Sequence, residues 1–103
     1  RQLKRILKRT GVGIARTGGY TGHGSGEVMI GFTTANRIPS GCEEELLQLS
    51  AIPEHVINRA FLAAAEAEQE AILNSMTAAK QTRGRKGELY YSLAEYLNDR
   101  KPE

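Results

Sequence analysis

A glycine-rich stretch that runs directly into an apolar one limits the possible folds of this chain more than any other feature. Residues 17–36 read TGGYTGHGSGEVMIGFTTAN, and five glycines fall within nine positions, at 18, 19, 22, 24 and 26. Glycine loses more conformational entropy on folding than any other residue, so this density needs a reason, and we expect the reason to be a catalytic loop. From residue 27 onward, apolar or small residues occupy both alternating sets of positions. We therefore predict a central strand over 27–34 that is covered on both faces.

The segment before the glycines predicts one helix and one short strand. Residues 2–10 place Leu, Ile and Thr side chains on one helical face with cations opposite, and Gly11 is expected to end this helix. Residues 12–16 (VGIAR) alternate in the manner of a strand. We expect this strand to pair antiparallel with residues 27–34.

The second half of the chain is expected to be mainly helical. Pro53 suits the first position of a helix, and residues 53–79 keep an apolar face at helical spacing. Residues 80–87 (KQTRGRKG) predict a turn or the tip of a hairpin. Residues 88–100 can be read as a short strand and a turn or as one helix, with a helix favoured at the end. Because a two-stranded sheet is marginal in water, we expect something else to complete the sheet.

Composition gives the broad class of the protein. At 103 residues the chain is one domain or part of one, and 40% hydrophobic and 25% charged residues are average for a soluble protein. No apolar run approaches the ~20 residues of a membrane span, so no membrane partner is expected. The chain opens at Arg1 in a helical pattern without Met or a cap, so we expect part of the protein upstream of it to be missing. No secretory segment is visible in these residues, but the missing upstream part is where one would lie, so the location stays open with the cytoplasm favoured.

Metal and nucleotide sites are not expected. Cys42 is the single cysteine, and His23 and His55 are far apart without cysteine partners at ligand spacing, so neither a metal nor a cofactor is predicted. Gly19 and Gly24 have the separation of a phosphate-binding loop. However, Ser25 stands where that motif requires Lys, and the predicted strand replaces the helix that would face the anion. The dinucleotide fingerprint and the nucleophile elbow do not match either.

Ser25 and Glu27 are the candidate catalytic residues. They are two positions apart at the beginning of the predicted strand, so their side chains lie on the same face. A hydroxyl beside a carboxylate can pass on a hydrogen bond or hold a nearby ammonium, and the neighbouring glycines allow a substrate backbone to approach. The alternative is that the glycines form an ordinary hairpin loop in which Ser25 is a turn residue.

The run GVGIARTGGYTGHGSGEVMIGFTTAN, followed by EAILNSM and TRGRKG, resembles the C-terminal region of the DmpA-type peptidases. This is the L-aminopeptidase/D-esterase and β-peptidyl aminopeptidase family, and the resemblance extends from about Leu3 to Leu97. It implies an α/β fold, an αββα sandwich of the DmpA/ornithine acetyltransferase type that is similar to the N-terminal-nucleophile hydrolases. Residues 1–103 would then be the C-terminal portion of a single peptidase domain.

The resemblance also implies a reaction. Such enzymes cut themselves before a serine, whose freed α-amine and hydroxyl then serve as base and nucleophile in hydrolysis of short peptides, amides or esters. Ser25 matches the second family serine, which contacts the nucleophile, and Glu27 matches the acidic partner. Glu27 would either stabilise the α-ammonium of the nucleophile or bind the amino group of the substrate. The nucleophile would lie upstream of Arg1, so the chain alone is expected to be inactive and to need the remainder of the enzyme, in a homo-oligomer.

Two other functions stay open on the sequence. The basic segment before residue 10 and the TRGRKG run suggest a module that binds nucleic acid or an acidic protein, but the net charge of +2 is small, so nucleic acid is not the expected partner. Ornithine acetyltransferase-like enzymes also self-cleave but transfer an acyl group. The GSGE spacing favours the aminopeptidase.

Overall fold

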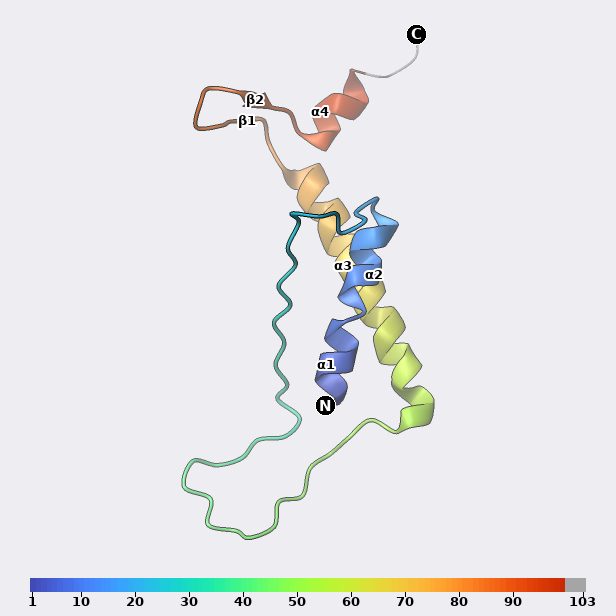
Figure 1. Cartoon of the computed structure of the whole chain (residues 1–103), viewed down its shortest axis with the longest axis vertical. Coiled ribbons are helices and arrows are strands. Elements are labelled where there is room, and N and C mark those ends of the chain that lie inside the picture. The colour runs from blue at the N-terminus through green and yellow to red at the C-terminus, as the bar shows by residue number, and fades with distance from the viewer. Residues whose placement is uncertain (100–103) are drawn as a thin grey trace.

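The computed structural model describes residues 1–99, and residues 100–103, which include the last position of the predicted C-terminal helix, lie outside the described part. Figure 1 shows a long helix, a pair of short helices beside it, a long loop and a small hairpin at one end. The elements in chain order are α1 (Gln2–Leu7), α2 (Thr10–Arg16), the 3-10 turn η1 (Glu54–Val56), α3 (Ile57–Ala78), β1 (Thr82–Arg83), β2 (Leu89–Tyr90) and α4 (Leu93–Asn98).

The prediction of a strand over residues 12–16 is wrong, because these residues belong to helix α2. Gly11 lies inside α2 and does not end the first helix, which stops at Leu7. The less exposed positions of α2 and its C-cap include Thr10, Gly13, Ile14 and Thr17, which follow the i, i+3, i+4, i+7 pattern of a helix face. Five alternating residues are too few to distinguish a strand from such a face.

Helix α2 packs against α3 at Gly13, where the two backbones approach closely. A Cβ atom added at Gly13 would lie 2.6 Å from the carbonyl oxygen of Ala65 and 2.8 Å from the backbone nitrogen of Gln69. Gly13 and Ala65 are both buried. The absence of a side chain at Gly13 is therefore what lets the two helices meet, and this tertiary contact accounts for a glycine in the middle of a helix.

Arg5 of α1 and Arg9, the N-cap residue of α2, contact η1 and the first turns of α3. The Arg5 guanidinium donates to both carboxylate oxygens of Glu54 at 2.8 Å, and the Arg9 guanidinium carbon lies 4.2 Å from the centroid of the Phe61 ring. Arg5 also lies over this ring, at 5.4 Å. Part of the positive charge that the sequence concentrates before residue 10 is thus used in contacts inside the chain.

The predicted strand over 27–34 does not form within residues 1–99. Residues 17–53 contain neither helix nor strand, and the antiparallel pairing expected with 12–16 is absent because 12–16 are helical. A strand exists only when its backbone groups pair with a neighbour, and the described residues supply no such neighbour here. The residues Val28, Ile30 and Phe32 are consequently 88%, 87% and 86% exposed.

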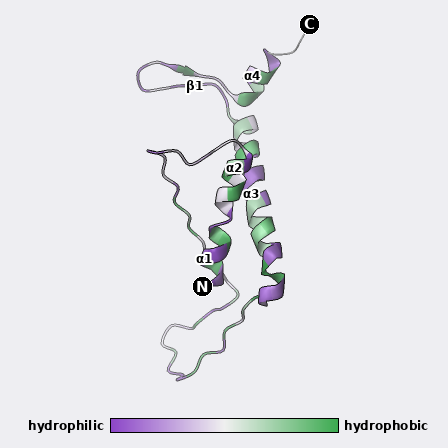
Figure 2. Cartoon of the chain, turned by 45° about the vertical axis from the view of Figure 1, so that its right-hand side comes forward, coloured by the Kyte–Doolittle hydropathy of each residue, from purple (hydrophilic) through white to green (hydrophobic). Residues whose placement is uncertain are grey.

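One face of this extended segment nevertheless lies on the helices. Gly31 faces Leu7, whose Cδ2 atom would be 2.8 Å from an added Cβ, and the Met29 methyl group comes near Gly11. The segment runs beside α1 in Figure 1. Hydrophobic residues recur along it as well as along the helices, as Figure 2 shows. One face of the segment therefore contacts the helices, whereas the apolar side chains on its other face are exposed.

The dimensions of the chain agree with an incomplete layer. The radius of gyration is 20.0 Å, whereas a compact domain of this length has one of about 13 Å. The accessible surface is 9215 Å², whereas a compact protein of this mass exposes about 5,700 Å². The helices and the extended segment thus do not close into a compact domain by themselves, and the full αββα sandwich stays a prediction.

The predictions for the second half of the chain are largely confirmed. The long helix expected over 53–79 begins later, since η1 precedes α3. The KQTRGRKG run is the tip of a hairpin in which Thr82 pairs with Tyr90 and Arg83 with Leu89, antiparallel. A helix does follow the hairpin, and its N-terminus is closed by a capping box between Ser92 and Glu95.

Candidate active site

Ser25 and Glu27 lie together in the structure. The Ser25 hydroxyl donates a hydrogen bond to Oε1 of Glu27 at 2.8 Å, and both side chains are exposed. The Ser25 backbone N–H also donates to the Gly22 carbonyl at 3.0 Å, so Ser25 is a turn residue, as in the alternative interpretation, although the described residues on either side of this loop do not form the two strands of a hairpin. Both readings of Ser25 are therefore compatible: the residue closes a turn with its backbone and contacts a carboxylate with its side chain.

The direction of this hydrogen bond determines what the pair can do. A serine hydroxyl has one donor and two acceptor lone pairs, and its donor is used on Glu27. The free lone pairs of Ser25 can then accept a hydrogen bond from an ammonium, an amine or a second hydroxyl. The Glu27 carboxylate adds a negative charge within reach of the same group. The pair thus suits a cationic or hydrogen-bond-donating partner.

The glycine-rich loop, residues 17–26, positions Ser25 and Glu27 through two local structures. Helix α2 ends in a Schellman motif, in which Gly18 N–H donates to the Ala15 carbonyl and Gly19 N–H donates to the Ile14 carbonyl, each at 3.1 Å. Gly18 has φ +96°, which such a helix end requires of its first residue beyond the cap. The glycine at position 18 therefore has a structural reason, so no catalytic role is needed to explain it.

Gly24, directly before Ser25, sets the direction in which the chain enters the extended segment. Its φ of +90° lies in the region that side chains other than glycine rarely adopt. The chain turns between Gly22 and Ser25 and then extends from Glu27 onward. Gly24 is thus the glycine of the loop whose conformation bears directly on the candidate site.

A depression of about 340 Å³ adjoins Glu27, between the extended segment and the helices. A second acid, Glu68 of α3, lines the same depression. Glu68 belongs to residues 53–79, for which the sequence predicts an apolar helix face, and sequence reasoning gave it no role; an acid at a position of that face was the available signal. A larger depression of about 510 Å³ lies at the other end of the extended segment, and neither Ser25 nor Glu27 lines it.

Residues 1–99 contain no group of three or more His, Cys, Asp or Glu side chains that could hold a metal ion. In the same part of the chain, no helix is both long and apolar enough to cross a membrane.

The family model described as Peptidase family S58 matches residues 1–90. The chain belongs to peptidase family S58. The prediction of a DmpA-type peptidase is thereby confirmed.

Two bacterial proteins and one archaeal crystal structure are similar to this S58 chain. Beta-peptidyl aminopeptidase BapA of Sphingosinicella microcystinivorans is 34% identical over 86 residues, which cover 84% of this chain and 22% of BapA. The protein of the same name from Sphingosinicella xenopeptidilytica is 28% identical over 93 residues, or 89% of this chain and 23% of that protein. The crystal structure of the PH0078 protein from Pyrococcus horikoshii OT3 matches with a TM-score of 0.85 and 46% identity, covering 95% of this chain and 28% of that one.

The S58 chain therefore spans about a quarter of the length of these relatives. The archaeal match covers nearly the whole chain, so the course of its helices and extended segment has a counterpart within a larger folded protein.

Proposed function

We propose that this chain is part of an autoprocessed serine aminopeptidase that removes N-terminal residues from short peptides, amides or esters. The observation that carries the proposal is the 2.8 Å hydrogen bond from Ser25 to Glu27 in a chain of peptidase family S58. Both curated relatives are named beta-peptidyl aminopeptidases, which supports a substrate with a free N-terminal amine.

The proposed nucleophile is a serine outside this chain, freed by self-cleavage. Its α-amine has an ordinary pKa near 8 and accepts the hydroxyl proton as the serine oxygen attacks the substrate carbonyl. Collapse of the tetrahedral intermediate breaks the scissile C–N or C–O bond, and the ammonium returns the proton to the leaving group. Water then hydrolyses the acyl-serine and restores the hydroxyl.

Ser25 and Glu27 serve the proton transfer in this proposal. The lone pairs of Ser25 accept a hydrogen bond from the amine or hydroxyl of the nucleophile, while the Ser25 hydroxyl continues to donate its proton in the hydrogen bond to Glu27. The Glu27 charge favours either the α-ammonium of the nucleophile during turnover or the ammonium of the substrate. Groups that stabilise the oxyanion come from outside this chain.

The chain by itself is proposed to be inactive for a structural reason. Ser25 and Glu27 are exposed at the beginning of an extended segment that has no sheet partner in residues 1–99. Catalytic groups need to be held by packed neighbours to within a fraction of an ångström. The segment therefore gains a fixed position only when the remainder of the enzyme pairs with it.

The test uses the full-length gene product. Intact mass and N-terminal sequencing determine whether it self-cleaves before a serine, and a panel of aminoacyl p-nitroanilides measures kcat and KM. Ser25→Ala is expected to lower kcat/KM roughly a hundredfold, since proton-transfer groups typically contribute that much or more. Glu66→Gln, on the exposed side of α3, is the matched control for Glu27→Gln and is expected to leave both constants unchanged.

Glu27→Gln distinguishes the two roles of the carboxylate. A higher KM with an unchanged kcat assigns Glu27 to the substrate amine, and a lower kcat assigns it to the ammonium of the nucleophile. An uncut, inert protein, or wild-type kinetics in both the Ser25 and Glu27 variants, would contradict the proposal. Transfer of the acyl group to an added amine in preference to water would instead favour the acyltransferase alternative.

A further inference from the structure

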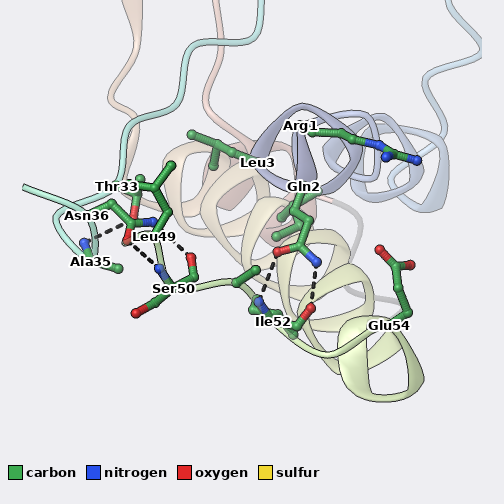
Figure 3. Close-up of a pocket in the computed structure, with 12 residues that line it drawn as sticks. Arg1, Gln2, Leu3, Thr33, Ala35, Asn36, Leu49, Ser50, Ile52 and Glu54 are labelled. Atoms are coloured by element: carbon green, nitrogen blue, oxygen red, sulfur yellow. Dashed lines mark hydrogen bonds between the residues drawn. The ribbon is translucent and has the colours of Figure 1, made fainter. Parts of the chain in front are cut away.

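Two side-chain amides bind the backbone of one short segment, Ser50–Ile52. The Asn36 amide accepts a hydrogen bond from Ser50 N–H at 2.7 Å and donates one to the Ser50 carbonyl at 2.9 Å. The Gln2 amide accepts from Ile52 N–H at 2.9 Å and donates to the Ile52 carbonyl. Figure 3 shows both amides facing this segment from the same side.

This arrangement imitates a strand pairing with side chains. In an extended chain the N–H and C=O groups of a residue point to the same edge, and alternate residues share that edge. Ser50 and Ile52 are such alternate residues. Each amide occupies the place that a peptide group of a neighbouring strand would take, and among side chains only Asn and Gln offer a donor and an acceptor in one amide plane.

The two amides also connect three parts of the chain. Gln2 is the first residue of α1, and Asn36 lies at the end of the extended segment that begins at Glu27. Because Asn36 binds Ser50 and Gln2 binds Ile52, the short segment Ser50–Ile52 links the end of the extended segment to α1. The other link is the approach of Gly31 to Leu7. The extended segment, which has no ladder of its own in residues 1–99, is thus tied to α1 at two points.

We propose that Gln2 and Asn36 are positioning residues that fix the register of residues 27–36 against α1 and thereby direct Ser25 and Glu27 to their working face. This inference rests on the proposed function for its catalytic consequence. Side chains on an extended chain alternate, so a slip of one residue moves each side chain to the opposite face. Such a slip would turn Val28 and Ile30 towards the helices and carry Glu27 away from them.

The test uses Asn36→Asp and Gln2→Glu in the full-length gene product. Each change keeps the size of the side chain but replaces the NH₂ donor with an oxygen that faces a backbone carbonyl. Amide hydrogen exchange over residues 27–36 and at Ser50 and Ile52 is expected to accelerate about tenfold, as loss of a hydrogen bond predicts. Gln48→Glu, an exposed residue of the same loop, is the matched control and is expected to leave exchange unchanged.

Acid pH should reverse the effect of Asn36→Asp. A protonated carboxyl again has one donor and one acceptor, so the fold raises the pKa of the introduced carboxyl above its ordinary value of about 3.9. The pairing is then present at low pH and is lost as the pH rises through that raised pKa. The ratio of the amide exchange rate in Asn36→Asp to that in the wild type should therefore approach one at acid pH. In Asn36→Leu the exchange rate should stay high at every pH.

A catalytic readout separates positioning from simple support of the fold. Asn36→Asp is expected to lower kcat about tenfold with little change in KM. In a Ser25→Ala background it should lower kcat no further, since it acts through Ser25. If amide hydrogen exchange is unchanged in Asn36→Asp, the amide pairing is refuted. If exchange is faster but the effects of Asn36→Asp and Ser25→Ala on kcat are additive, the positioning role is refuted. If the protein hydrolyses nothing, the proposed function fails, while exchange and its pH dependence still test the pairing.

Discussion

The close approach of α2 to α3 at Gly13 gives the sharpest stability prediction. Gly13 of α2 is buried against α3, and an added Cβ would lie 2.6 Å from the Ala65 carbonyl oxygen and 2.8 Å from Gln69 N. These are backbone atoms, so they cannot rotate out of the way. Ordinary van der Waals contact begins at 3.4 Å, so the backbones must separate by 3.4 minus 2.6, or 0.8 Å, at the nearest atom.

Gly13→Ala is therefore expected to destabilise the full-length protein by a net amount of about 1–2 kcal/mol. Forcing an extra methyl group into a packed contact costs typically about 1–3 kcal/mol, and contact with rigid backbone lies towards the upper part of that range. The higher helix propensity of alanine offsets up to about 1 kcal/mol of this destabilisation. Separation of α2 from α3 would also weaken the packing of neighbouring side chains.

The same substitution two residues earlier is the control. Gly11 is also in α2, but its added Cβ would meet only the Met29 methyl carbon at 3.7 Å, an ordinary contact. Gly11→Ala is therefore expected to stabilise the protein by about 0.5–1 kcal/mol through helix propensity alone. Urea unfolding of both variants measures the difference. If Gly13→Ala were to stabilise the protein as much as Gly11→Ala, the backbone contact between α2 and α3 would be refuted.

Two further predictions concern the helix ends. Hydrogen bonds from Arg5 hold the pKa of the Glu54 carboxyl below its ordinary value of 4.5, so this pair contributes stability at neutral pH that is lost as the pH falls through the lowered pKa. NMR titration of the Glu54 carboxyl carbon should show the pKa rising towards its ordinary value in Arg5→Gln, and an unchanged titration would argue against the pair. Ser92→Ala removes the cap of α4, in which Ser92 Oγ accepts from Glu95 N–H at 3.2 Å. It should cost about 1 kcal/mol in chemical unfolding, whereas Ser40→Ala in the exposed loop should cost nothing measurable.

Local patterns predicted the elements that depend on local interactions. The apolar face of 53–79, the turn residues of KQTRGRKG and the helix at the end of the chain all correspond to elements of the structure. Hydrogen bonds in a helix or a tight hairpin join residues close in sequence, so the segment itself carries most of the information. The helix predicted to begin at Pro53 begins at Ile57, because the 3-10 turn η1 precedes α3.

The errors fall where distant residues decide the conformation. Residues 12–16 alternate like a strand, yet they are helical, with Gly13 in contact with a helix some fifty residues later in the chain. Residues 27–34 have the composition of a buried strand, yet the described residues contain no neighbour for them to pair with. The amide pairs from Gln2 to Ile52 and from Asn36 to Ser50 had no local signal at all.

The sequence by itself determined the family of this chain, the spacing of Ser25 and Glu27 and the helical character of α3, because motif spacing and periodicity are properties of the chain alone. Only the tertiary structure decided that residues 12–16 form a helix packed on α3 through Gly13 and that side-chain amides replace a strand beside Ser50 and Ile52. Each of these depends on which groups meet in space and satisfy one another's hydrogen bonds or volume, and a pattern within one segment does not contain that information.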